Sequence, residues 1–157
     1  MKTTPVLKRR NLGITDYQKR YRLLKSNVTR AVVRPTNKGL MIEFVDYSPS
    51  GDLVKVTVTD KTLQKEYGVY GNNIQAMYLA GYLAGKKAAE KGIESAIFDT
   101  GRYKFIHGGR LAAALKGIVD SGIEIPASED VFPDESRING EHLKNKVDIS
   151  KYVKKGE

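Results

Sequence analysis

The first half of the chain contains three short strand-like runs, and in the second and third of them side chains alternate with the period typical of β-strands. Leu40, Ile42 and Phe44 mark one face of the second run, and a valine at every second position marks the third. Turn-forming segments rich in Pro, Asn, Ser and Gly separate the runs. The pattern predicts an antiparallel three-stranded meander with one buried face and one mixed face. The strands are expected at 29–34, 40–47 and 53–59.

A longer apolar segment repeats with the period of a helix. Asn72 or Asn73 can cap this helix, which runs to about Lys91 and is ended by Gly92. Its apolar stripe narrows to small residues, which allow the helix backbone to come close to the sheet. These small residues are Gly81, Ala84, Gly85 and Ala88.

The next segment alternates between strand and helix. A strand at 95–99, a helix at about 109–121 and a strand at 123–125 form a β-α-β unit. With the meander, this unit predicts an α/β fold with a mixed sheet and helices packed on it. After Pro126 the periodicity is lost, so we expect an irregular tail over 127–157 that docks on the domain or on a neighbour.

The N-terminal segment divides into an arm and a helix. Residues 1–14 have no apolar period and are expected to form an extended basic arm that becomes ordered on a partner. Thr15 can cap a helix over 15–27, the first element of a globular domain spanning 15–126. We expect its apolar stripe to pack on the body, its tyrosines included, and its basic face to point outward. The stripe consists of Tyr17, Tyr21, Leu24 and Val28, and the outward face of Lys19, Arg22 and Lys25.

Charge is concentrated at the N-terminal end of the chain. The 157 residues carry 27 Lys and Arg against 18 Asp and Glu, a net charge of +9. Residues 1–38 hold 11 of these bases and a single acid, Asp16. A basic segment on a near-neutral body is the footprint of a protein that binds a polyanion. A solvated basic surface without a partner is the alternative. An acidic membrane surface is a less suitable polyanion, because the arm lacks the apolar face that membrane-surface helices need.

Composition excludes several kinds of chemistry. The chain has no cysteine, which removes disulfides, thiolate metal sites and cysteine nucleophiles. Two histidines, His107 and His142, are too few and too far apart to indicate a metal site. The longest apolar stretch is too short to cross a membrane.

One catalytic motif needs weighing. Phe-Asp-Thr-Gly at 98–101 follows a strand, as in aspartic proteases, so Asp99 is a remote candidate for a catalytic residue. Such a site needs two carboxylates that share a proton, and here it would require a homodimer. The basic stretch that follows opposes proton sharing, which favours a strand end followed by a turn.

Two glycine-containing segments could be taken for phosphate sites. Residues 81–87 resemble a phosphate loop but lack its spacing and its hydroxyl residue, and they lie inside a predicted helix. His107 with the two following glycines precedes a helix, where backbone N–H groups could hold a phosphate near Arg102, Lys104 and Arg110. A flexible surface loop is the equally simple interpretation of that segment.

Five segments, in order, resemble the archaeal and eukaryotic type of the large-subunit ribosomal protein L-eighteen family. The resemblance covers nearly all of residues 5–143, although Gly39 stands where a larger, often basic residue is expected. The segments are YQKRYRLLKS, RPTNKG, GNNIQAMYLAGYLAGKKAAEKG, FDTGRYKFIHGGRLAAALKGIVDSGIEIP and VFPDESRINGEHL.

The resemblance implies a non-catalytic protein of the large ribosomal subunit in the cytoplasm. It implies binding of 5S rRNA, attachment of that RNA to 23S rRNA in the central protuberance, and a neighbouring protein of the L-five family. No cofactor, metal, membrane or small-molecule substrate is implied. A basic RNA-binding module outside the ribosome is the alternative.

Carried over by position, the resemblance assigns RNA contacts to three regions. The arm and first helix contribute Lys8, Arg9, Arg10, Lys19, Arg20, Arg22 and Lys25; the first hairpin contributes Arg30, Arg34, Asn37 and Lys38; and the loop after the fourth strand contributes Arg102, Tyr103, Lys104, His107 and Arg110. In that loop, Tyr103 is expected to stack on an unpaired base.

Overall fold

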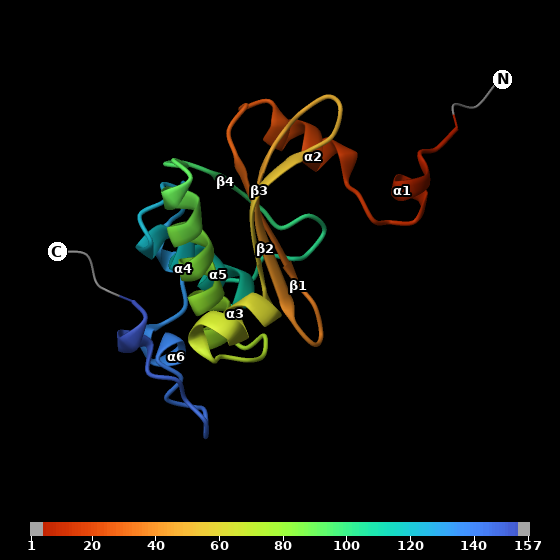
Figure 1. The fold of residues 1–157 in the computed structure, drawn as a ribbon. Coiled ribbons are helices and arrows are strands. Elements are labelled where there is room, and N and C mark those ends of the chain that lie inside the picture. The colour runs from red at the N-terminus through yellow and green to blue at the C-terminus, as the bar shows by residue number, and fades with distance from the viewer. Residues whose placement is uncertain (1–4, 154–157) are drawn as a thin grey trace.

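A four-stranded mixed sheet lies at the centre of the computed structural model, which describes residues 5–153 (Figure 1). The outermost residues of the expected arm and tail, 1–4 and 154–157, lie outside the described residues. The strand order is β3-β2-β1-β4; β1, β2 and β3 pair antiparallel, and β4 pairs parallel with β1. This confirms the predicted meander and mixed sheet. The strands are β1 (Arg30–Pro35), β2 (Leu40–Asp46), β3 (Leu53–Thr59) and β4 (Ile97–Asp99).

The register of the strands explains why one face of the sheet is buried. Ile42 of β2 lies opposite Val33 of β1 and Val58 of β3, and all three are fully buried. Because side chains alternate between the two faces of a strand, the residues between them point to the other side. There, β3 exposes a run of polar and apolar residues from its start.

Two helices, α4 (Ile74–Glu90) and α5 (Arg110–Asp120), lie side by side on the buried face of the sheet (Figure 1). Asn73 caps α4, as expected, because its side chain accepts a hydrogen bond from the Ala76 N–H at 2.8 Å. A Cβ atom at Gly81 would lie only 2.2 Å from the carbonyl oxygen of Ala114. Glycine therefore sets how closely the two helices approach.

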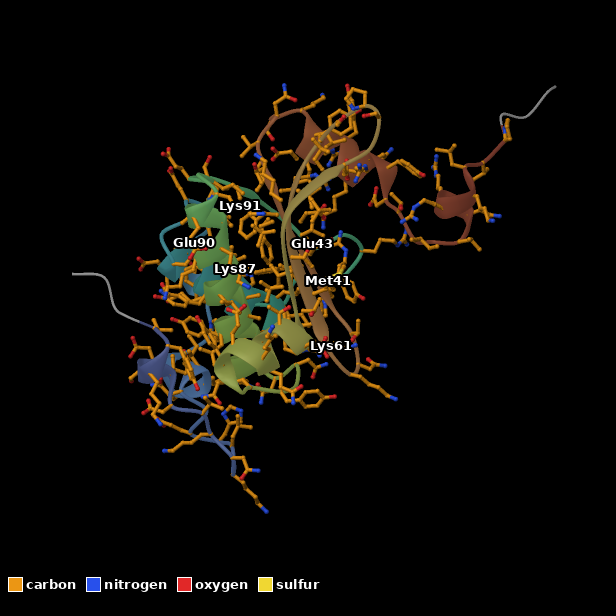
Figure 2. The ribbon with its side chains drawn as sticks, in the orientation of Figure 1. Met41, Glu43, Lys61, Lys87, Glu90 and Lys91 are labelled. Atoms are coloured by element: carbon orange, nitrogen blue, oxygen red, sulfur yellow. The ribbon has the colours of Figure 1, made fainter. Side chains whose placement is uncertain are left out.

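The solvent side of the C-terminal half of α4 is polar. Figure 2 labels Lys87, Glu90 and Lys91 at this end of α4. Met41 and Glu43, which the same figure labels, belong to β2 of the sheet. Glu90 and Lys91 are exposed. The helix thus shows its small, apolar side to the protein and its charged side to water.

Two elements differ from the sequence-based expectation. Residues 123–125 do not form a full strand, because only Glu124 bridges to Ser95, in parallel orientation. An additional helix, α3 (Asp60–Tyr67), follows β3 directly. Its N-cap is Thr59, and it ends at Gly68, whose φ of +68° suits glycine.

The N-terminal part contains α1 (Lys8–Asn11), a single turn within the arm, and α2 (Tyr17–Leu24). The expectation that Thr15 caps α2 was wrong. Asp16 is the N-cap and accepts from the Lys19 N–H at 3.0 Å, whereas Thr15 accepts from Arg9 Nε at 2.9 Å. The Thr15 hydroxyl and the Asp16 carboxylate therefore fix the path of the chain into α2.

The C-terminal tail packs against the N-terminal end of α4, far from α1 (Figure 1). The buried Gln75 side chain donates to the carbonyl of Val147 at 2.8 Å and accepts from its N–H at 3.0 Å. Tyr152 stacks on Tyr67 with ring centroids 4.5 Å apart. Short helical turns interrupt the irregular tail at η1 (Glu129–Val131), α6 (Glu135–Ile138) and η2 (Ile149–Lys151).

None of the helices in residues 5–153 combines the length and the apolarity that crossing a membrane requires.

Candidate nucleic-acid interface

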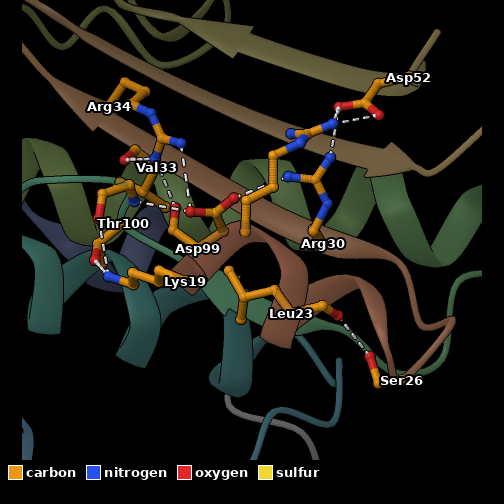
Figure 3. Close-up of polar contacts among 11 residues, drawn as sticks. Lys19, Leu23, Ser26, Arg30, Val33, Arg34, Asp52, Asp99 and Thr100 are labelled. Atoms are coloured by element: carbon orange, nitrogen blue, oxygen red, sulfur yellow. Dashed lines mark hydrogen bonds and ion pairs between the residues drawn. The ribbon is translucent and has the colours of Figure 1, made fainter. Parts of the chain in front are cut away.

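Two cations of α2 attach this helix to the body of the protein. Lys19 Nζ donates to Thr100 Oγ1 at 3.0 Å and to the carbonyl oxygen of Gly101 at 2.9 Å (Figure 3). Arg20 donates to both carboxylate oxygens of Asp52, each at 2.9 Å. The prediction that Lys19 faces outward was therefore wrong. Its partners, 81 and 82 residues away along the chain, leave no trace in the local pattern.

The outer surface of α2 consists of different residues. Arg22 and Lys25 are exposed, as predicted. Tyr21 is 63% exposed, although its place in the apolar stripe indicated packing, and Lys25 Nζ lies 4.8 Å from the centre of its ring. Tyrosine presents both an apolar ring and a polar tip, so a stripe that counts it as apolar overestimates the buried side.

A chain of ion pairs connects α2 to the sheet. Arg30, only 3% exposed at its side chain, donates to Asp52 at 2.6 Å and to Asp99 at 2.9 Å. Asp52 joins Arg30 to Arg20, and Asp99 joins Arg30 to Arg34 at 3.4 Å (Figure 3). Three arginines thus share two carboxylates of the same chain, and this pairing makes it possible to bury the Arg30 guanidinium.

The surroundings of the Asp99 carboxylate favour its ionised form. Burial by itself raises its pKa, but the Gly101 N–H and the guanidinium groups of Arg34 and Arg30 outweigh burial, and the pKa lies below its ordinary value. An aspartic protease needs two carboxyl groups that share one proton, whereas Asp99 is surrounded by cationic donors. The geometry around Asp99 opposes that chemistry.

The same residue fixes the loop after β4. Asp99 Oδ1 accepts from the Gly101 N–H at 2.8 Å, while Arg34 donates to the Asp99 carbonyl oxygen at 2.7 Å. Gly101 has a φ of +58°, and a Cβ atom there would lie 2.9 Å from Arg34 Cζ. The loop consequently turns sharply at Gly101 and presents three exposed residues, Arg102, Tyr103 and Lys104.

The remaining candidate residues lie in separate places. Lys8, Arg9 and Arg10 are exposed on α1, and His107 and Arg110 are exposed before and at the start of α5. Asn37 and Lys38 are exposed at the tip of the β1–β2 hairpin.

At the hairpin, Gly39 lies next to α3, the helix that begins at Asp60. A Cβ atom at Gly39 would lie 3.1 Å from the Asp60 carboxyl carbon, so a larger residue requires that side chain to shift by a few tenths of an ångström. Nothing in the structure explains why glycine stands here in place of the basic residue that the family resemblance leads us to expect.

Several candidate residues meet around one cleft of about 460 Å³. Its walls come from the arm, α2, the end of β1 and the loop after β4. The predicted residues in its lining are Arg9, Lys19, Arg20, Arg34, Arg102 and Tyr103. Sequence reasoning missed the acidic partners Asp16 and Asp52, and it treated Asp99 only as a catalytic candidate. No local signal identifies Asp52, because it lies in an ordinary turn segment and its partners come from other elements.

The α/β platform pairs some of its cations with carboxylates of the same chain and exposes others from separate segments. This arrangement is typical of a nucleic-acid-binding protein. The family model for ribosomal large subunit proteins 60S L5 and 50S L18 matches residues 5–95. The chain belongs to this family of large ribosomal subunit proteins.

Curated relatives extend the similarity along the chain. The large ribosomal subunit protein uL18 of Picrophilus torridus is 61% identical over 155 residues, covering 99% of this chain and 98% of the relative. That of Thermoplasma acidophilum is 57% identical, with 95% and 92% covered, and that of Korarchaeum cryptofilum is 46% identical, with 87% and 70% covered. The chain is accordingly a structural, RNA-binding component of the large ribosomal subunit and not an enzyme.

Proposed function

We propose that this chain binds 5S rRNA and attaches it to 23S rRNA in the central protuberance of the large ribosomal subunit in the cytoplasm. The observation that carries the proposal is the distribution of exposed cations. The exposed cations among the residues predicted to bind RNA project from α1, α2, the β1–β2 hairpin, the loop after β4 and the start of α5; α3, α4 and the tail expose further lysines. A protein of the L-five family, which also serves 5S rRNA, is the proposed protein neighbour.

The candidate residues divide into three groups by their surroundings. Arg30 is buried between two carboxylates, so its role is to hold the platform together. Lys19, Arg20 and Arg34 are hydrogen-bonded within the protein and also line the cleft, which leaves them a side toward RNA. The phosphate-binding group consists of the exposed residues Lys8, Arg9, Arg10, Arg22, Lys25, Asn37, Lys38, Arg102, Lys104, His107 and Arg110.

Phosphate neutralisation sets the expected strength and salt dependence of binding. With about six to ten phosphate contacts, affinity should fall roughly 10³- to 10⁵-fold between 50 and 200 mM salt. Filter binding to a transcript of 5S rRNA from Picrophilus torridus, a source of the relatives described above, measures this slope. Affinity that stays flat over that range rejects the phosphate-neutralisation account.

Sequencing the RNA that copurifies with the chain tests its identity. Enrichment of 5S rRNA over other small RNAs supports the proposal, and enrichment of a different RNA supports the rival, a basic RNA-binding module outside the ribosome. Deleting residues 1–14 should weaken binding far more than deleting 144–157, although both segments expose cations. The arm lines the cleft beside α2, whereas the tail packs on the opposite part of the domain. Equal losses would contradict the proposal.

A further inference from the structure

We propose that the cleft between the arm, α2 and the loop after β4 receives one unstacked nucleotide of the bound RNA. This inference rests on the proposed function and adds a defined binding site to it. The base of the nucleotide enters the cleft, and its phosphate stays at the rim.

The dimensions of the cleft suit a single nucleotide. Its volume of about 460 Å³ falls in the range of roughly 300–1,000 Å³ in which proteins hold small organic ligands. A duplex keeps its bases stacked inside and presents only its backbone, whereas loops and bulges offer bases that can leave the stack. The volume of the cleft accommodates one such unstacked nucleotide but not a duplex.

The lining supplies a different partner for each part of a nucleotide. Arg9 and Arg102 are exposed side chains in the wall and can bind phosphate oxygens at the rim. Ile14 and Leu23 give an apolar surface for the flat face of a base, and Tyr103, which is 44% exposed, offers a ring for stacking.

The apolar part of the lining determines which end enters. Asp16 and Asp99 also line the cleft, but both already accept hydrogen bonds within the protein, Asp16 from the Lys19 N–H and Asp99 from Gly101 and two arginines. A site for phosphates alone would not need apolar side chains, which favour the entry of a base.

The cleft is held in shape before RNA arrives. Lys19 ties α2 to Thr100 and Gly101 on one side, and Arg9 Nε donates to Thr15 Oγ1 at 2.9 Å on the arm side. A preformed site binds more tightly because less freedom is lost when the ligand enters.

A cleft-filling variant tests this proposal without removing a charge. Leu23→Trp should weaken binding of the Picrophilus torridus 5S transcript about 5- to 150-fold, the value of one stacked base, and leave the salt slope unchanged. Leu53→Trp is the matched control, because Leu53 is 62% exposed on β3 and does not line the cleft. Thermal unfolding followed by circular dichroism checks that both variants fold.

Tyr103 gives an independent second measurement. Tyr103→Ala should weaken binding by a similar factor and Tyr103→Phe should keep most of it, while Tyr70→Ala, at a 66% exposed tyrosine outside the cleft, should have no effect. Dimethyl sulfate probing should find an unpaired adenine or cytosine that the unaltered chain protects and Leu23→Trp leaves reactive.

Two results would overturn the inference in distinguishable ways. If the unaltered chain binds the transcript but Leu23→Trp and Tyr103→Ala both bind within twofold of it and protect the same bases, the cleft holds no nucleotide while the proposed function stands. If the unaltered chain does not bind the transcript at 50 mM salt, the proposed function is rejected, and this inference with it.

Discussion

Arg30 and Asp99 form a buried ion pair at 2.9 Å although they lie 69 residues apart in the sequence. The pair connects the first strand of the sheet to the last, at the point where β1 and β4 run parallel. Arg34 and Gly101 donate to the same carboxylate. One aspartate therefore stabilises both the sheet and the loop that carries Arg102 and Tyr103.

Replacing this aspartate should destabilise the fold strongly. Asp99→Asn leaves the Arg30 guanidinium buried without one of its two anions, and breaking such a pair costs about 3–5 kcal/mol. Glu66→Gln is the control, because its pair with Lys87 is solvent-exposed and should contribute at most about 1 kcal/mol. Urea denaturation measures the free energy of unfolding of both variants; equal losses would contradict the assigned role.

Acid should weaken this contribution. The pKa of Asp99 is lowered by its donors despite its burial, so the folded state binds a proton less readily than the unfolded chain does. Its stabilisation is complete well above the ordinary value of 3.8 and is lost as pH falls through the lower pKa of the folded state. The difference in unfolding free energy between the unaltered chain and Asp99→Asn should therefore shrink below about pH 4. A difference that stays constant from pH 7 to pH 2 would show that ionisation of Asp99 is not its source.

Exposed cations should affect RNA binding without affecting stability. Arg22→Ala and Lys25→Ala should each lower the salt slope of binding by about one and leave the unfolding midpoint unchanged. Lys144→Ala is a suitable control, because Lys144 is exposed in the C-terminal tail, which lies away from α2 (Figure 1). The prediction fails if Lys144→Ala changes the slope as much as the other two.

For Gly81→Ala, the close packing of α4 on α5 predicts a loss of stability, whereas helix propensity predicts a gain. Gly81→Ala should favour an isolated helix by about 1 kcal/mol, yet the new Cβ would meet a backbone carbonyl at 2.2 Å. Overpacking of this kind costs about 1–3 kcal/mol, so the net effect should be a loss of stability. The control Ala89→Gly, at an exposed position of α4, makes the reverse exchange and measures the propensity effect alone, as a loss of stability. Stabilisation by Gly81→Ala, measured by thermal unfolding, would contradict the packing found here.

The tail should loosen when its main polar anchor is removed. Gln75→Met keeps the size of the side chain but abolishes the hydrogen bonds to both polar backbone groups of Val147. Hydrogen exchange should become faster at Val147, while 5S rRNA binding should be unchanged because the tail lies away from the interface. Slow exchange at Val147 in this variant would mean that Ile149 and Tyr152 hold the tail without help.

The regular elements could be predicted because each has a local cause. Alternating side chains mark the second and third strands of the meander, and Asn73 and Gly92 mark the ends of the longest helix in the sequence itself. Helix α3 could also have been found from Thr59 and Gly68, a cap and a stop separated by eight residues. Its apolar residues are too few for a visible stripe, so Leu63 alone is buried.

The internal contacts of the interface could not be predicted in the same way. Lys19 faces inward because Thr100 and Gly101 lie there, and Arg30 is buried because Asp52 and Asp99 meet it. Each partnership joins segments far apart in the chain, so a charge count along the sequence treats a structural arginine and a free one alike.

Asp52 and Asp99 offset two of the three positive charges of Arg20, Arg30 and Arg34 from within the chain, so the folded domain does not depend on RNA to balance the centre of its platform. The domain can therefore fold first and meet its RNA afterwards. Ribosome assembly would then receive this protein as a finished part.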